Sequence, residues 1–197
     1  MSQGISQRRY EDEEESYDPA DTGEVRELHS GDEVLLSGVI YTSRDAGHKR
    51  LVETHMKGEE MPVDLTDATI FFVGPTPAKP GQALGSCGPT TSYRMDAYSP
   101  YLIRNCGLKG MIGKGKRNDE VIEAMKDCSA VYFGAIGGAG ALLSTCVVKS
   151  EIIAYEDLGA EALRRLEVVD MPLTVVIDCY GNNLYKTGVE EYLKTVK

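Results

Sequence analysis

Short apolar segments alternate along this chain with segments of helical periodicity, and this alternation constrains the fold more than any other feature. Residues 68–73 (ATIFFV), 130–135 (AVYFGA) and 173–179 (LTVVIDC) have the length and composition of buried strands. Residues 118–128 (NDEVIEAMKDC) instead place their apolar side chains on one helical face, after Asn118 as a candidate N-cap. Strands that alternate with helices predict the α/β class.

The other predicted elements fit the same alternation. They are strands at 33–43, 110–115 and 149–155 and helices at 96–105, 137–146 and 189–196. The helix at 96–105 contains Pro100, which a helix accepts only in its first turn. Every apolar run is far shorter than the roughly 20 residues of a membrane-spanning helix, so a membrane protein is not expected.

The N-terminal segment has a different composition from the rest. Seven of the twelve residues at 10–21 are Asp or Glu, and aliphatic residues are nearly absent there. Such a segment cannot bury enough apolar surface to offset its ordering entropy. We therefore expect an acidic, disordered or draped tail at 1–22 and one globular domain at 23–197. A docking arm for a basic partner is the alternative for the tail.

Charge and cysteine usage exclude several classes of protein. With 21 Lys and Arg against 31 Asp and Glu, the net charge is −10, which disfavours binding to nucleic acid or anionic membranes. The five cysteines contain no CxxC pair, so neither a zinc ribbon nor a self-contained iron–sulfur site is expected. Free thiols and an N-terminus without an apolar signal segment predict a reducing, cytoplasmic setting.

Three clusters combine glycine, hydroxyl and basic residues, and each is predicted to lie at the end of a strand or helix. They are 42–50 (TSRDAGHKR), 88–96 (GPTTSYRMD) and 109–117 (KGMIGKGKR). Their 27 positions hold eight of the 21 basic residues. In an acidic chain, this concentration predicts a local site for a small anion. A charged hairpin end is the alternative for 42–50, and 109–117 lacks the Ser or Thr of a phosphate loop.

The middle cluster has the clearest chemistry. Thr90, Thr91 and Ser92, placed before a helix, would offer hydroxyls and unpaired backbone N–H groups to a carboxylate or phosphate. Arg94 can bind a carboxylate through two parallel hydrogen bonds. The alternative is a capped helix start with a structural pair between Arg94 and Asp96.

In this order, the three clusters resemble the β subunit of the class I (iron–sulfur) fumarate hydratases and the related tartrate dehydratase β subunits. The resemblance covers roughly residues 25–185, including 130–143 (AVYFGAIGGAGALL) and 175–183 (VVIDCYGNN). It implies a swivelling β/β/α domain, a β-sheet core flanked by helices. It also implies the reversible hydration of fumarate to (S)-malate.

The resemblance further implies roles for individual residues. Thr90 matches the proposed catalytic base, with Thr91 as an alternative, and Arg44, Arg94 and Lys114 match residues that bind the dicarboxylate substrate. The [4Fe-4S] cluster would be held by three cysteines of a separate α subunit, so no metal ligand is expected in this chain. The proton donor to the leaving hydroxyl would also lie on that partner, in a hetero-oligomer of α and β.

We therefore expect a hydro-lyase: the β subunit of an iron–sulfur fumarate hydratase. The alternative enzyme is the β subunit of L-tartrate dehydratase or of another 2-hydroxy-dicarboxylate hydro-lyase. A non-catalytic module that binds a dicarboxylate is the alternative outside enzymes.

Overall fold

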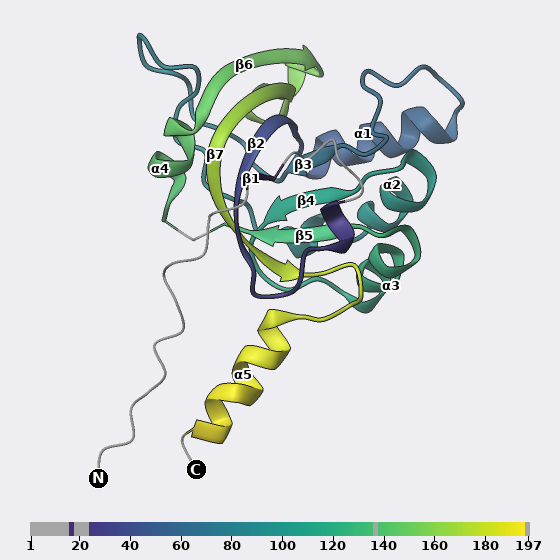
Figure 1. Ribbon diagram of the computed structural model, residues 1–197. Helices are drawn as coiled ribbons and strands as arrows, with labels where there is room; N and C mark the ends of the chain where they lie inside the picture. Colours follow the sequence, from purple (N-terminus) through teal and green to yellow (C-terminus); the bar gives the residue numbers. More distant parts are fainter. Residues whose placement is uncertain (1–15, 18–23, 136–137, 196–197) are drawn as a thin grey trace.

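A closed sheet forms the centre of the structure, a computed structural model that describes residues 16–17, 24–135 and 138–195. Its strands are β2 (Glu33–Thr42), β3 (Thr69–Phe71), β4 (Gly110–Gly113), β5 (Val131–Gly134) and β7 (Leu163–Ile177). The first four run parallel in this order, and β7 pairs antiparallel with both β5 and β2, which closes the barrel (Figure 1). The predicted α/β class and the swivelling β/β/α fold are confirmed.

Two further strands lie at the edges of this barrel. β6 (Val147–Ala154) pairs antiparallel with the first half of β7. β1 (Ser16–Tyr17) pairs in parallel with Leu35 and Leu36 of β2. The rest of the predicted acidic tail lies outside the described residues, so its disorder, and the division into 1–22 and 23–197, stay predictions.

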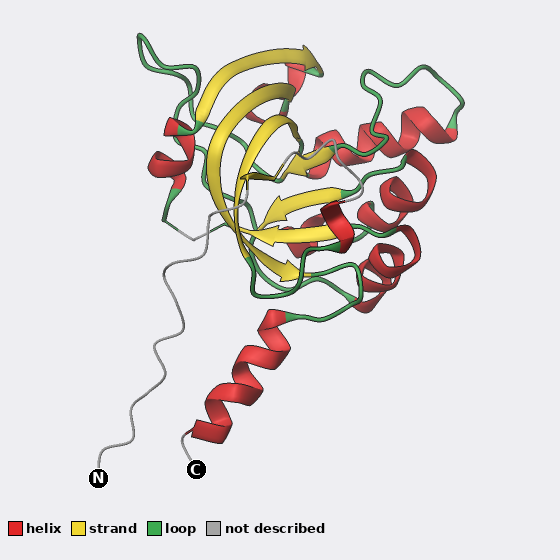
Figure 2. Ribbon diagram, in the orientation of Figure 1, coloured by secondary structure: helices red, strands yellow, loops and turns green. Residues whose placement is uncertain are grey.

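Helices cover the outer face of the parallel strands. They are α1 (Asp45–Met56), α2 (Ser99–Cys106) and α3 (Asp119–Cys128), drawn to one side of the sheet in Figure 2. α3 begins at the predicted N-cap, where Asn118 Oδ1 accepts a hydrogen bond from the Val121 N–H at 2.9 Å. α2 begins at Ser99 and has Pro100 in its first turn, where a proline costs no helical hydrogen bond.

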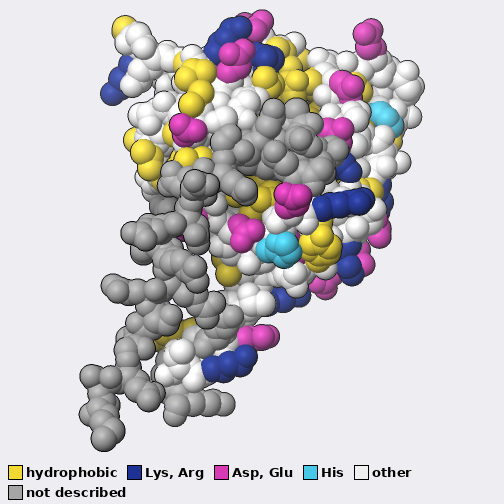
Figure 3. All heavy atoms as spheres, in the orientation of Figure 1, with side chains coloured by type: hydrophobic (Ala, Val, Ile, Leu, Met, Phe, Trp, Pro, Cys, Tyr) yellow, Lys and Arg dark blue, Asp and Glu magenta, His cyan; other side chains and the backbone are white. Residues whose placement is uncertain are grey.

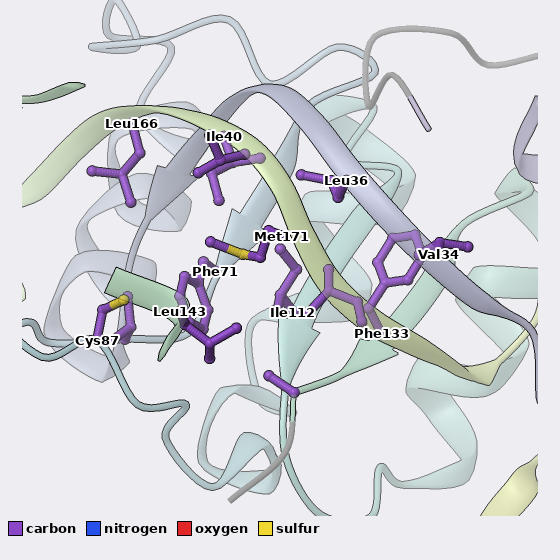
Figure 4. Close-up of a cluster of buried hydrophobic side chains, with 14 of the residues drawn as sticks. Val34, Leu36, Ile40, Phe71, Cys87, Ile112, Phe133, Leu143, Leu166 and Met171 are labelled. Atoms are coloured by element: carbon purple, nitrogen blue, oxygen red, sulfur yellow. The ribbon is translucent and has the colours of Figure 1, made fainter. Parts of the chain in front are cut away.

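Alternation along the strands divides the core into two layers. Phe71, Ile112 and Phe133 belong to the cluster inside the barrel, shown in Figure 4. Ile70 and Tyr132, each one residue earlier on its strand than a member of that cluster, belong to the cluster beneath the helices. Because both faces of the parallel strands are buried, the strands read in the sequence as continuous apolar runs rather than alternating ones.

Several predicted boundaries were wrong. The predicted strand at 173–179 is the end of β7, which begins ten residues earlier, at Leu163. The segment at 42–50 is no hairpin end, because its second half begins helix α1. The terminal helix α5 (Leu184–Thr195) begins five residues earlier than predicted, and α4 (Gly140–Thr145) is shorter than predicted.

None of the helices in the described part of the chain has the length and apolar character needed to cross a bilayer. On the face drawn in Figure 3, acidic and basic side chains are interspersed over the surface.

Candidate active site

The carboxyl ends of three neighbouring parallel strands bring the sequence clusters together. β2 ends at Thr42, two residues before Arg44, while β4 ends at Gly113, one residue before Lys114. β3 lies between them. In α/β sheets, ligands bind at this edge, where the strands end and the loops begin.

The 88–96 cluster is inserted between the ends of β3 and β4. The Thr90 N–H donates to Phe72 O at 2.7 Å, just past the end of β3. The Ser92 N–H donates to Lys114 O at 2.9 Å, and the Lys114 N–H donates in return to Ser92 Oγ at 3.0 Å. The backbone therefore fixes Thr90 and Lys114 at the same edge of the sheet.

This arrangement corrects one expectation about anion binding. The N–H groups of Thr90 and Ser92 are engaged with the strand ends, so they are not free for an anion. The segment continues into a short 3₁₀ turn, η2 (Ser92–Met95), and not directly into a helix. The predicted helix start with unpaired N–H groups at 90–92 was therefore wrong, and the candidate anion ligands are side chains.

Arg44 is the N-cap residue of α1, and its side chain lies between a glycine and a carboxylate. A Cβ on Gly74 would lie 2.7 Å from Arg44 Nη1, so only glycine leaves room for the guanidinium there. Arg44 Nη2 forms an ion pair with Glu161 Oε1 at 3.5 Å. The Arg44 side chain is 22% exposed, which leaves part of it open to a ligand.

Arg94 pairs with α1 rather than with its own segment. Its Nη2 lies 2.6 Å from Asp45 Oδ2, and its side chain is 42% exposed. The alternative pair between Arg94 and Asp96 was wrong, because Asp96 Oδ1 accepts from Arg117 Nε at 2.6 Å.

The buried pair of Arg117 and Asp96 joins the second and third clusters. The Asn118 N–H donates to Asp96 Oδ2 at 2.8 Å, and Arg117 Nη2 donates to Ser99 Oγ at 2.7 Å. The Arg117 guanidinium carbon also lies 5.1 Å from the centre of the Tyr132 ring. Burial lowers the pKa of Arg117. Its contacts are internal, so Arg117 is not a ligand for an outside anion.

Lys109 does not lie at the predicted anion site either. It lies one residue before β4, at the opposite end of the strand from Lys114, and its Nζ donates to Cys128 O. Two of the eight clustered basic residues, Lys109 and Arg117, therefore have internal partners, and the candidate cations are Arg44, Arg94 and Lys114, one from each cluster.

Two tyrosines that the sequence analysis missed hold the Lys114 loop in place. Tyr132 Oη donates to Gly115 O at 3.0 Å, and the Gly115 N–H donates to Tyr185 Oη at 3.1 Å. Gly115 has φ +86°, a conformation that favours glycine. Tyr132 Oη also lies 2.9 Å from Ser92 Oγ, and burial raises its pKa. The strand pattern of 130–135 could have revealed Tyr132 as a polar group needing a partner.

The described residues do not fit a resident iron–sulfur cluster. All five cysteines are free, and the described part of the chain contains no group of three or more Cys, His, Asp or Glu side chains able to hold a metal. Cys87 is fully buried, and burial raises the pKa of its thiol to about 12, which opposes the thiolate that iron binds.

A cavity of about 440 Å³ lies away from this edge. It is lined by His55 near the end of α1, by Cys106 at the end of α2 and by Asp64 between them, and it includes none of the four predicted site residues. The four residues Arg44, Thr90, Arg94 and Lys114 instead form an open edge, with Arg94 and Lys114 exposed and the other two half-buried.

Comparison with known proteins identifies the family. A family model described as the fumarase C-terminus matches residues 12–188. The aerobic class I fumarate hydratase of Escherichia coli is 38% identical over 77% of this chain, which spans only 28% of that relative. The putative class I fumarate hydratase of Geobacillus stearothermophilus is 34% identical over 85% of this chain, which spans 32% of it.

One relative is matched over most of its own length. The putative L(+)-tartrate dehydratase subunit β of Methanocaldococcus jannaschii is 35% identical over 83% of this chain and 86% of its own length. Both the family match and this relative span most of the sequence, and the predicted resemblance is confirmed. This chain therefore belongs to the fumarase C-terminus family.

Proposed function

We propose that this chain is the β subunit of an iron–sulfur fumarate hydratase, which hydrates fumarate reversibly to (S)-malate together with an α subunit. The observation that carries the proposal is the gathering of Arg44, Thr90, Arg94 and Lys114 at one edge of the sheet. The chain spans only about a third or less of the class I fumarate hydratases that it resembles. The proposal of a separate α subunit is supported by a relative that is named as a subunit β.

The three cations suit a dicarboxylate. Fumarate and malate each carry two negative charges, and two arginines with one lysine can neutralise both carboxylates. A guanidinium binds a carboxylate through two parallel hydrogen bonds, whereas an ammonium acts as a point charge. Arg44 and Arg94 would therefore orient the carboxylates, and Lys114 would add charge where negative charge accumulates in the transition state.

Thr90 would transfer the proton to and from a carbon atom of the substrate. In the dehydration of malate, its Oγ1, as the alkoxide, would accept the proton from the carbon next to one carboxylate, while the hydroxyl of the neighbouring carbon leaves as water with a proton from the partner. In hydration, Thr90 would return a proton to carbon and the partner would take one from water. Positioned proton transfer of this kind contributes about 10²- to 10⁴-fold to rate.

The [4Fe-4S] cluster belongs to the α subunit in this proposal. Two observations on the described residues support this placement: their cysteines are free, and burial raises the pKa of the Cys87 thiol. The chain's own contribution is substrate binding and proton transfer in a site that the partner completes.

L(+)-tartrate dehydration is the second candidate. The relative from Methanocaldococcus jannaschii, of which this chain covers 86%, is named a putative L(+)-tartrate dehydratase subunit β. Tartrate is also a dicarboxylate with a hydroxyl beside each carboxylate, so the same three cations would suit it.

The test is a substrate comparison with the reconstituted pair. The chain is purified with its α subunit under anaerobic conditions, and steady-state kinetics are measured on malate, fumarate, mesaconate and L-tartrate. We expect kcat/KM for malate and fumarate to exceed that for tartrate. Turnover of tartrate but not malate would replace fumarase with tartrate dehydratase. Binding of malate with no turnover on adding the α subunit would indicate a non-catalytic module.

A further inference from the structure

Glu161 connects a distant segment to the N-terminus of α1. It is the last residue of η3 (Glu156–Glu161), 115 positions from Ala46 in the sequence. Its two carboxylate oxygens have different partners. Oε2 accepts from the Ala46 N–H at 3.2 Å, and Oε1 forms the ion pair with Arg44 Nη2 at 3.5 Å.

Glu161 and Gly74 together restrict the Arg44 side chain. The bond to Ala46 fixes the carboxylate at the N-terminus of α1, where the helix dipole favours a negative charge. Gly74 lies close to the same side chain, because a Cβ there would lie 2.7 Å from Arg44 Nη1 and 3.2 Å from Cδ. An arginine held in this way loses little rotamer entropy when a carboxylate binds to its remaining N–H groups.

We infer that Glu161 is a positioning residue, which sets the orientation of Arg44 for the substrate carboxylate. This inference rests on the proposed function, because it takes Arg44 as a ligand of the substrate. Glu161 lies outside the three sequence clusters, so its position in the sequence predicts no role for it. Glu161 reaches Arg44 and Ala46 only because η3 packs on α1 in the folded chain.

The same two elements provide a matched control. Asp157, also in η3, accepts from Arg50 of α1, with Arg50 Nη1 and Asp157 Oδ1 2.7 Å apart. This pair connects η3 to α1 as the Glu161 pair does, but it is exposed and touches no predicted site residue. If Glu161 served only to attach η3, the loss of Asp157 would have the same effect.

Glu161→Gln separates positioning from attachment. The amide has the size of the carboxylate but an acceptor oxygen at only one of its two terminal positions, so it cannot accept from Ala46 at one position and from Arg44 at the other. One of the two contacts then becomes a donor facing a donor. We expect kcat/KM of the assembled enzyme to fall about tenfold or more, because a small misplacement of a substrate-binding group is costly in the transition state. Asp157→Asn should stay within twofold of the wild type.

A double-mutant cycle with Arg44→Ala decides whether Glu161 acts through Arg44. If it does, adding Glu161→Gln to Arg44→Ala causes no further loss of kcat/KM. The four chains of this cycle and Asp157→Asn are titrated with succinate, an unreactive dicarboxylate, and their thermal midpoints are measured. We expect the same pattern of non-additive losses in succinate affinity, with the midpoint of Glu161→Gln within a few degrees of that of Asp157→Asn.

Two results would overturn the positioning role: a Glu161→Gln enzyme within twofold of the wild type, or losses that multiply in the double variant. Both can occur in an enzyme that hydrates fumarate, so they leave the proposed function intact. A wild-type pair that turns over none of the dicarboxylates and a wild-type chain that binds no succinate would overturn the proposed function and this inference together.

Discussion

Asp45 Oδ2 lies 2.6 Å from Arg94 Nη2, which attaches the second sequence cluster to the first turn of helix α1. Arg44, the residue before Asp45, is the N-cap of the same helix. One helix end therefore sets the separation of the two arginines proposed to bind the two carboxylates of the substrate. This relationship brings the first and second clusters together although Asp45 and Arg94 are 49 positions apart in the sequence.

Replacement of Arg94 should damage catalysis much more than folding. Arg94→Ala removes a charge-assisted contact worth about 2–4 kcal/mol in the transition state, so kcat/KM should fall about 30- to 900-fold. Arg104→Ala is the matched control, because Arg104 pairs with Asp127 and its side chain is 38% exposed, close to the 42% of Arg94. Equal activities of the two variants in the assembled enzyme would contradict the site assignment.

The reacting hydroxyl can be identified by removing each threonine hydroxyl in turn. We expect Thr90→Val to lower kcat by about 100-fold or more, since positioned proton transfer contributes at least that much. Thr91→Val should have a much smaller effect, because the Thr91 methyl packs against Gly115, with Cγ2 3.6 Å from the position of a Cβ there, and valine keeps that methyl. The reverse order of the two effects would assign the reacting hydroxyl to Thr91.

The buried His48 should make stability depend on pH. It lies beneath the site, its Nδ1 donates to Arg44 O at 3.1 Å, and burial lowers its pKa from 6.5 to about 3. The unfolded chain binds a proton on this histidine below pH 6.5 and the folded chain does not, so its contribution to stability is complete above pH 6.5 and declines as pH falls. Between pH 7 and pH 5 the loss is about 2 kcal/mol.

Urea unfolding at pH 7 and pH 5 measures this effect. His48→Asn keeps a donor for Arg44 O but cannot titrate, so its stability should change about 2 kcal/mol less than that of the wild type over this range. His29→Gln, at an exposed histidine, serves as the control and should behave as the wild type does. The same pH dependence in His48→Asn and the wild type would show that another group is responsible.

The pair of Arg117 and Asp96 should be necessary for stability. Arg117→Met leaves a buried carboxylate without its partner, and such a loss costs about 3–5 kcal/mol. Arg50→Met removes the exposed pair with Asp157 and should leave the unfolding free energy near that of the wild type. Chemical denaturation of both variants checks this. A stable Arg117→Met chain with weakened malate binding would instead return Arg117 to the anion site.

Sequence patterns placed the four candidate residues at the ends of elements but missed one of the elements around them. Arg44, Thr90, Arg94 and Lys114 were predicted at the ends of elements, and the structure places them at one edge. Helix α1 was missed because its buried face consists of Gly47, His48, Leu51 and Val52, which give a weak apolar pattern.

The closing strand and the internal roles of two cations depend on long-range packing. The first part of β7 contains Arg164, Arg165 and Glu167, and these charged residues hide the fact that Leu163 and Leu166 are buried. Arg117 resembled its exposed neighbour Lys116 in the sequence, and only the position of Asp96 decides that it is buried. The fold brings Arg117 to Asp96, 21 positions away in the sequence. Composition alone could therefore not distinguish the buried Arg117 from the exposed Lys116.

The most direct test of the account is the activity of this chain with and without its partner. The purified full-length chain and an anaerobically reconstituted pair with the α subunit are assayed for interconversion of malate and fumarate. We predict no turnover by the chain alone and a rate that rises with added α subunit until the two are equivalent. Full activity of the chain by itself would contradict the claim that its site is completed by a second polypeptide.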